Sequence, residues 1–488
     1  MIVMKFGGTS VENAVAIDRV ASIVHSRLAR KPVVVVSAMA KVTDGLLEIA
    51  RVAAAGNLAK AIENCNALHD RHRHAIGELI PEEQRPAVLS EIDAQFTRLA
   101  EVVKGIAAVG ECSPRTSDFV ASFGELLSST IVVGAFSARG INAVWVDPRQ
   151  CLVTNAEHTC AAPIFAETNP RMVAQIAPFV DNGRVPVMGG FVGATAAGAT
   201  TTIGRGGSDY SAAIVGAALD AKRIEIWTDV EGMLTTDPRI CPNALPIRSI
   251  SFDEAAEMAY FGAKVLHPAT LLPAIQKNIP VYVLNSRNLQ SRGTCIRATA
   301  PRSRTLFRAI AAKKGVSIIS VYAPRTLVAH DFLHSLFEVL HRHRVPIDIV
   351  STSEVSVSLT LDSSRDISEL VAELREVGEV VYEEKQAIVC LVGSDIHGRV
   401  GVAGQVFTAI AQAGVSVRMI SQGASEINIS FVIREDDLLT AVRHLHAVFF
   451  EDGAAVIGKR AAAASAAVRF ESNAYLRRAR PQTRQRVN

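Results

Sequence analysis

The sequence predicts an α/β sandwich followed by two small α+β units. Up to about residue 298, short β-branched runs such as KPVVVVSA, RIEIWTD and IPVYVLN alternate with amphipathic stretches. This alternation is typical of parallel strands that are joined by helices and buried on both faces. After the polar, proline-bearing stretch TAPRSRT the pattern changes, and residues 336–361 match residues 406–431 at an offset of 70 residues. An internal repeat of this kind indicates two copies of one structural unit.

Each repeat has the pattern of a helix, a turn, a strand, a turn and a second strand. With a strand before the helix and a helix after the hairpin, each unit is expected to be a ferredoxin-like βαββαβ fold. Paired units of this size favour a binding interface for a small ligand over a catalytic core. The predicted domains are residues 1–298, 308–382 and 386–452, with a basic, disordered tail at 453–488.

Composition limits the class of protein. The 488 residues carry a net charge of +3, and the last segment holds enough arginine to leave the rest near neutral, which argues against a nucleic-acid-binding face. No secretion signal and no apolar run of membrane-spanning length is evident. The seven cysteines contain no CxxC pair, so we expect reduced thiols in a cytoplasm and no metal centre. The histidines of HDRHRH, 69–74, are expected to lie on a solvated helix face.

The opening VMKFGGTS places Lys5 at the end of a strand, ahead of Gly7, Gly8 and Thr9. Free backbone amides at a helix N-terminus attract anions, and a lysine adds a full positive charge. The same glycine pair equally fits a tight turn that needs positive φ. From spacing alone, both interpretations stay open.

The stretch GRGGSDYSA, 204–212, lies between a predicted strand and a buried helix. Its glycines would let main-chain amides approach phosphate oxygens, Arg205 can fork onto an anion, and Asp209 can hold a metal or a lysine. Another strand, VVVVSAMAKVT, delivers Ser37, Lys41 and Thr43 at its carboxyl end, where open α/β sheets bind ligands.

Two further motifs complete the set of anion-seeking groups. WTDVEGMLTTDPR places Thr228 and Asp229 at a strand end and Arg239 in a turn, and FGAKVLHPAT carries Lys264 among small and apolar residues. His267 is expected to end a helix. No Ser-His-Asp or Cys-His arrangement is evident. Lysines, an arginine and glycine-rich turns together favour phosphoryl transfer, with magnesium bridging the donor.

Together KFGGTSV, GRGGSDYSA, WTDVEGMLTTDPR and AAEMAYFGAKVLHPATLLPA closely resemble aspartokinases, specifically the monofunctional, lysine-sensitive kind. The resemblance runs from residue 1 to about 451. It implies a three-layer αβα amino-acid-kinase domain, two ACT domains, and transfer of the γ-phosphoryl of ATP to the side-chain carboxylate of L-aspartate. This is the first step toward lysine, threonine and methionine. The resemblance also implies Mg²⁺ bound with ATP, inhibition by lysine, and a homodimer formed through the ACT domains, with further assembly to a tetramer.

The resemblance carries roles to individual positions of this sequence. Lys5, Asp209 and Lys264 correspond to catalytic residues, and Thr43, Glu125 and Arg205 to aspartate-binding residues. The ATP-binding positions are Lys5, Phe6, Gly7, Gly8, Thr9, Thr228, Asp229, Leu234, Arg239 and Lys264. The effector-binding positions are Thr326, Phe332, Leu333, Asp348, Ser353 and Glu354.

The sequence departs from the family pattern at several of these sites. Phe123 replaces a common histidine beside Glu125, and Leu234 replaces an aromatic residue near adenine. Thr326 and Asp331 stand where lysine-sensitive relatives have methionine and glycine.

Two alternative functions remain at this stage. One is an enzyme of the same fold with another acceptor, such as glutamate 5-kinase, acetylglutamate kinase or carbamate kinase. The other is a non-catalytic amino-acid sensor. A fusion with homoserine dehydrogenase is excluded, because too few residues follow the second repeat and no GxGxxG fingerprint occurs there.

Overall fold

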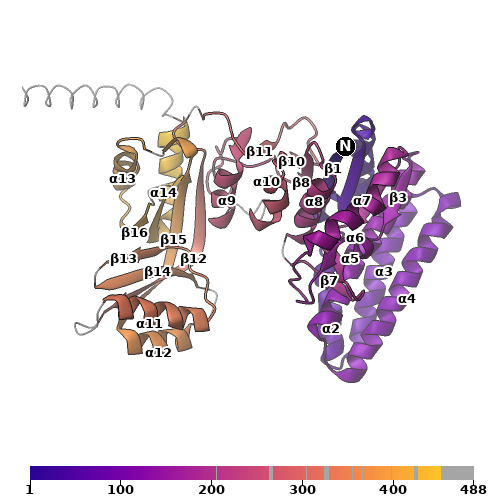
Figure 1. The fold of residues 1–488 in the computed structure, drawn as a ribbon, viewed down its shortest axis with the longest axis horizontal. Helices are drawn as coiled ribbons and strands as arrows, with labels where there is room; N and C mark the ends of the chain where they lie inside the picture. Colours follow the sequence, from indigo (N-terminus) through magenta and orange to yellow (C-terminus); the bar gives the residue numbers. More distant parts are fainter. Residues whose placement is uncertain are drawn as a thin grey trace, which may run out of the picture. The chain divides into compact units, whose positions relative to one another are not determined.

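The computed structural model describes residues 1–204, 206–262, 268–303, 305–323, 329–353, 355–363, 367–396, 398–422 and 427–451. The chain divides into two compact units (Figure 1). The first contains residues 1–234 and 246–301, and the second contains 235–245 together with the chain from 302 onward. The segment 235–245 therefore groups with the regulatory sequence, although it was predicted within the first domain. Lys264, His267, Arg205, Thr326, Glu354 and the tail 453–488 lie outside the described residues.

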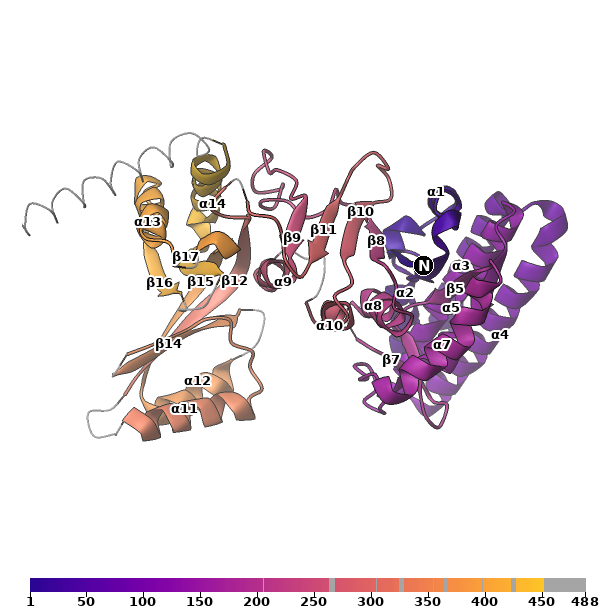
Figure 2. The ribbon, with the colours of Figure 1, turned by 45° about the horizontal axis from the view of Figure 1, so that its top comes forward.

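An eight-stranded sheet forms the centre of the first unit. All its strand pairs are parallel except β10 with β11. Runs such as PVVVV of β2 are wholly buried, as expected for a sheet covered on both faces. Figure 2 follows the sheet from β9 through β11 and β10 to β8. Its order is β3 (Ala143–Val146), β5 (Val185–Gly189), β2 (Pro32–Val36), β1 (Ile2–Phe6), β8 (Ile224–Thr228), β10 (Val281–Asn285), β11 (Thr294–Arg297) and β9 (Ser249–Ser251).

Helices cover both faces of this sheet, which confirms the predicted α/β sandwich. On one face, Met4, Phe6 and Val34 join a single core with α1 (Ala14–His25), α2 (Val42–Ala54), α3 (Leu58–Leu79), α4 (Arg85–Val109) and α5 (Pro114–Ala138). On the other face, α7 (Phe165–Asp181), α8 (Gly207–Ala218) and α10 (Leu272–Gln276) pack together. Smaller elements are α6 (Pro148–Cys151), α9 (Phe252–Tyr260) and the sheet β4 (Val153–Thr154), β6 (Val192–Thr195) and β7 (Thr200–Thr202).

Helix α5 is long and apolar enough to cross a membrane by length and composition alone, contrary to the sequence analysis. Most of its apolar window is buried inside the first unit, so packing accounts for its composition.

The long helices α3 and α4 lie side by side over α2 and α5 (Figure 1). The expectation of a solvated histidine face on α3 is wrong for His72, which is fully buried against Phe96. Its Nδ1 lies 2.6 Å from the Leu68 carbonyl oxygen. Burial lowers the pKa of His72 to about 4, so the ring is neutral at physiological pH. His69 is only partly exposed and contacts Asp93 at 2.7 Å.

The second unit contains one six-stranded antiparallel sheet shared by both repeats. Its order is β13 (Val350–Thr352), β14 (Ser356–Asp362), β12 (Ala309–Tyr322), β15 (Glu379–Val392), β17 (Asn428–Arg434) and β16 (Val417–Ser421). Helices α11 (Ala329–Arg342) and α12 (Ser368–Val377) cover one half, and α13 (Val402–Gln412) and α14 (Leu438–His446) cover the other (Figure 1).

The two repeats interlock through the long strands β12 and β15. Residues 309–313 of β12 pair with 388–392 of β15, beside the second repeat, while 316–322 pair with β14 in the first. In the second repeat, the last strand of the predicted βαββαβ unit is therefore supplied by the start of β12. The described chain after α14 instead forms a π-helical turn, Ala447–Glu451. Each long strand changes register at a residue with positive φ, Gly315 (70°) in β12 and Lys385 (56°) in β15.

Candidate active site

A polar cavity lies where the central parallel strands end. Phe6 at the end of β1 pairs with Val36 of β2 and Trp227 of β8, so the loops that follow these strands begin at one edge. Open α/β sheets bind ligands at this edge. The cavity has a volume of about 280 Å³, and its lining residues are Lys5, Ser37, Thr43, Glu125, Phe191, Gly204, Gly206, Gly207, Ser208 and Asp209. The structure thus brings together five candidate residues from four separate stretches of the sequence: Lys5, Ser37, Thr43, Glu125 and Asp209.

Lys5 and Asp209 form a charge pair inside this cavity. The Lys5 Nζ lies 2.7 Å from Asp209 Oδ1, and the two side chains are only 11% and 14% exposed. An ion pair removed from water in this way holds both groups in fixed positions. The ion pair therefore fixes the position of the Lys5 ammonium inside the cavity.

The N-terminus of α8 opens at the same cavity. Gly206 adopts φ 71° at the N-cap position, a left-handed conformation that favours glycine, and no side chain caps the helix. The first-turn amides of Ser208 and Asp209 thus lack a capping side chain, which is the arrangement that binds phosphate at helix N-termini. This supports the interpretation of GRGGSDYSA as an anion-binding turn.

Glu125 brings a buried carboxylate to the cavity from the middle of α5. The residue is 4% exposed, and its Oε2 has no hydrogen-bond partner among the described residues. Burial raises the pKa of Glu125 to about 8, although the Ala38 backbone amide and the charge of Lys5 act in the opposite direction. A buried acid with an unused oxygen is suited to bind a cationic group of a ligand.

Several residues that build the cavity were not identified from the sequence. Phe191 lines it with φ 63°, an uncommon value for a bulky residue that often marks a functional site. Its neighbour Gly190 has no room for a side chain, because a Cβ atom would lie 2.7 Å from the Ser208 Cα. The motif MGGF, 188–191, which spans the end of β5, could have indicated these residues.

Asp118 is a second residue that sequence reasoning missed. It is 1% exposed and accepts hydrogen bonds from the Thr159 amide at 3.0 Å and the Thr202 hydroxyl, and it contacts His158 Nδ1 at 2.7 Å. These contacts fix the loop beside Gly204. Nothing in the local sequence distinguishes Asp118 from an exposed helical aspartate.

The glycine pair after β1 serves partly as a structural turn. The Gly7 amide donates to the Trp227 carbonyl at 3.0 Å, and a short 3₁₀ helix (Gly8–Ser10) precedes α1, which begins only at Ala14. The Gly7 amide is therefore not available to a phosphate, and with φ −70° at Gly7 the turn does not need positive φ there.

The residues expected to bind ATP are divided between the two units. Thr228 and Asp229 end β8, where the Thr228 hydroxyl donates to Asp229 at 3.2 Å. Leu234 is half-buried in the first unit. Arg239 belongs to the second unit, is 85% exposed and forks onto Asp237 at 2.6 and 3.0 Å.

The expected effector residues lie in the first repeat. Asp348 is almost buried, and both its carboxylate oxygens contact Lys313 Nζ, at 2.7 and 2.8 Å. Phe332 is buried in the core under α11, and Leu333 packs against the same core. Ser353 accepts a hydrogen bond from the Ser356 amide at 3.1 Å in an exposed turn.

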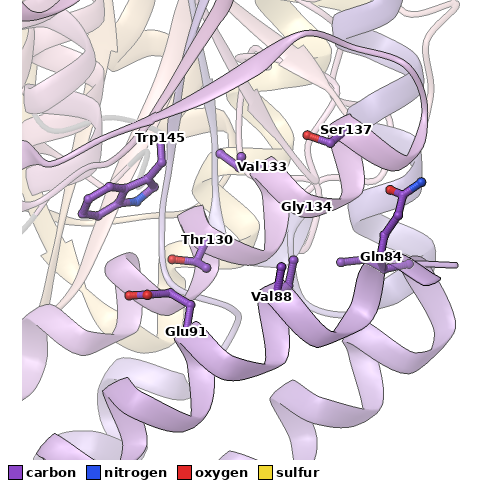
Figure 3. Close-up of a pocket in the computed structure, with 10 residues that line it drawn as sticks. Gln84, Val88, Glu91, Thr130, Val133, Gly134, Ser137 and Trp145 are labelled. Atoms are coloured by element: carbon purple, nitrogen blue, oxygen red, sulfur yellow. The ribbon is translucent and has the colours of Figure 1, made fainter. Parts of the chain in front are cut away.

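A second cavity, of about 380 Å³, lies among α4, α5 and the edge strand β3 (Figure 3). Val88, Val133 and Trp145 give it a largely apolar lining, and its only charged lining residue is Glu91. Without a lysine or arginine in its lining, it does not suit a triphosphate.

A mainly parallel sheet with a Lys–Asp pair, an uncapped helix N-terminus and a buried acid at one edge fits the class of enzymes that transfer a phosphoryl group. In agreement, the model of the Amino acid kinase family matches residues 1–285, and an ACT domain model matches residues 389–449. Lysine-sensitive aspartokinase 3 of Escherichia coli (strain K12) is 38% identical over 461 residues, which cover 92% of this chain and 99% of that protein. The chain belongs to the aspartokinases.

Solved structures agree in fold over the same length. E. coli aspartokinase III in complex with aspartate and ADP (R-state) gives a TM-score of 0.79 at 36% identity and covers 92% of this chain and 100% of that chain. The complex with lysine and aspartate (T-state) gives 0.77 at the same identity and coverage. The enzyme is therefore an aspartate kinase, as the motifs predicted, and these relatives support neither another acceptor nor a non-catalytic sensor.

Proposed function

We propose that the cavity at the end of β1 binds L-aspartate through Glu125, Arg205 and Thr43. The ionised carboxylate of Glu125 would accept the α-ammonium group, and Arg205 would bind the α-carboxylate in a bidentate manner. The unpartnered, buried Glu125 oxygen in the same cavity as the Lys5–Asp209 pair is the observation that carries this assignment. It supplies a cation site at short range from a phosphate site.

In the proposed reaction, a side-chain carboxylate oxygen of aspartate attacks the γ-phosphorus of ATP. A P–O bond forms to aspartate, the bond to the β-phosphate oxygen breaks, and ADP leaves with that electron pair. The attacking carboxylate is already ionised at neutral pH, so no general base is required. Lys5 and Lys264, with the α8 amides, stabilise the charge on the transferring phosphoryl, and Asp209 orients Lys5.

The nucleotide is proposed to bind as MgATP along Phe6, Gly7, Gly8, Thr9, Thr228, Asp229, Leu234, Arg239 and Lys264. The described carboxylates that line the cavity are Glu125 and Asp209, and Asp209 already pairs with Lys5. Because few protein ligands are left for a resident metal, the ion would be held mainly by the phosphates.

Lysine is the proposed effector, bound at the first repeat near Asp348 and Glu354, and the dimer is proposed to form through the ACT domains. The crystal structure of the E. coli enzyme with lysine and aspartate supports this choice of effector. None of the seven cysteines, all of which the structure describes, forms a disulfide bond, in keeping with a reducing compartment, and we propose the cytoplasm.

An ATP-dependent hydroxamate assay with aspartate, glutamate and N-acetylglutamate tests the assignment. Product is expected with aspartate only, and Lys5→Met should lower kcat by 10² or more, the order of loss seen when one preorganised charge-stabilising group is removed. Lys60→Met, which removes an exposed lysine of α3, should leave kcat unchanged. Undiminished turnover in a folded Lys5→Met enzyme would refute the proposed phosphoryl site.

A further inference from the structure

Three potential metal ligands meet in the second unit. Cys241 lies in the segment 235–245, His446 is the last residue of α14, and Glu451 ends the π-helical turn that follows. One ligand atom from each of the three lies within 4.8 Å of the other two. The thiol and the imidazole are buried, at 5% and 0% exposure, and the carboxylate is exposed.

The surrounding contacts hold these side chains in place. The Cys241 amide donates to the Asp237 carbonyl at 2.9 Å, which fixes the turn that carries the thiol. Arg443 of α14 donates to the Ile240 carbonyl at 2.8 Å, so the turn is anchored to the helix that carries His446. The site is thus assembled by packing between distant segments.

The His446 ring is arranged as metal-binding imidazoles usually are. Its Nδ1 lies 2.8 Å from Glu451 Oε1, and its Nε2 lies 2.9 Å from the Thr235 hydroxyl. A hydroxyl can donate or accept, so Thr235 satisfies Nε2 in either tautomer. Without metal, Nδ1–H donates to Glu451 and Thr235 donates to Nε2. With metal on Nδ1, the proton lies on Nε2 and is donated to Thr235, an outer contact that is typical of ligating histidines.

We propose that Cys241, His446 and Glu451 bind a zinc ion that fastens the segment 235–245 to α14. A thiolate, an imidazole and a carboxylate are the ligand types that Zn²⁺ uses, and water would fill the fourth tetrahedral position. Ligand atoms around tetrahedral zinc lie roughly 3.3–3.7 Å apart, given bond lengths of about 2.0–2.3 Å. The His446–Glu451 contact would widen by less than about 1 Å, which the exposed Glu451 allows. On binding, the Cys241 thiol releases its proton.

Cobalt titration of the full-length, chelator-treated protein tests the proposal, because Co²⁺ replaces Zn²⁺ and reports its ligands by absorbance. The expected result is one Co²⁺ per chain, with a thiolate-to-cobalt charge-transfer band and the visible bands of tetrahedral cobalt, both displaced by zinc. Cys241→Ser should abolish the charge-transfer band. Glu451→Gln, at an exposed residue, should weaken binding at least tenfold.

The matched control is Cys160→Ser, because Cys160 is the exposed thiol of this chain and the most accessible one for adventitious metal. It should bind Co²⁺ as the parent does. A charge-transfer band that survives in Cys241→Ser, that disappears in Cys160→Ser, or that never forms in the parent would overturn the proposal. If Cys241→Ser does not fold, unchanged affinity in Glu451→Gln would overturn it equally.

Discussion

At the scale of single residues, Glu125 is the group whose chemistry depends most on its surroundings. Burial stabilises its neutral form, while a bound ammonium group would stabilise the ionised form. Phe123, which replaces the common histidine, is buried two residues before Glu125 on α5. Its ring forms an edge contact with Phe119, and a phenyl ring cannot form a hydrogen bond to the Glu125 carboxyl group as a histidine could. The free enzyme therefore keeps Glu125 largely protonated below about pH 8.

This predicts a pH dependence of aspartate binding. Because the pKa of Glu125 is raised to about 8, the carboxylate form that binds the ammonium group becomes populated only as pH rises toward 8. The value of kcat/KM for aspartate should therefore rise by roughly tenfold per pH unit below pH 8 and level off above it. Steady-state kinetics from pH 6 to 9 measure the profile. Glu125→Gln should lose both the affinity for aspartate and the rise of kcat/KM below about pH 8. Glu91→Gln, on α4, should retain both. A flat profile in the parent enzyme would contradict the assigned role.

At the scale of elements, the shared strands β12 and β15 join the repeats into one sheet. Each strand passes from one repeat to the other at a residue with positive φ. At Gly315 a Cβ atom would meet nothing within 4 Å, so the left-handed backbone alone selects glycine there.

A pair of glycine substitutions should therefore have opposite effects. Gly315→Ala is expected to destabilise the second unit by about 1 kcal/mol, because an L-residue pays that conformational cost at positive φ. Gly404→Ala in α13, where space is equally free but φ is helical, should stabilise it by about 0.5–1 kcal/mol. Thermal unfolding of the two variants and the parent provides the measurement. Shifts of the same sign would show that local backbone conformation does not control this junction.

Over the whole molecule, local patterns predicted the α/β sandwich and several of the residues that line the cavity at the end of β1. Lys5, Thr43 and Asp209 could be found because each lies near the end of a buried strand or in the first turn of a helix. Cys241 and His446 could not, because only tertiary packing brings them together. The sequence analysis also did not predict that β12 is shared between the two repeats. Strand pairing depends on long-range register, and the sequence of each repeat by itself fits a complete βαββαβ unit. Asp118 shows the same limit for a buried acid on a helix.

The Lys313–Asp348 pair predicts how strongly the effector acts on the enzyme. If the lysine effector places an ammonium group on Asp348, it must compete with the Lys313 ammonium already 2.7 Å away. Lys313→Met removes that competitor and leaves an almost buried carboxylate without its partner, so inhibition by lysine should occur at roughly tenfold lower concentration, since 1.4 kcal/mol corresponds to a factor of ten. Linkage requires lysine to raise the unfolding temperature more in this variant than in the parent.

Inhibition curves and thermal shifts with added lysine measure both effects, and Lys314→Met, at the neighbouring exposed lysine, serves as the control. Because Lys313 lies outside the proposed catalytic cavity, activity without lysine should stay at the parent level. Sensitivity to lysine that is unchanged in Lys313→Met would place the effector away from Asp348. A loss of inhibition would instead assign Lys313 to the contact that transmits the effector signal, because only a ligand with different affinity for two states can shift them.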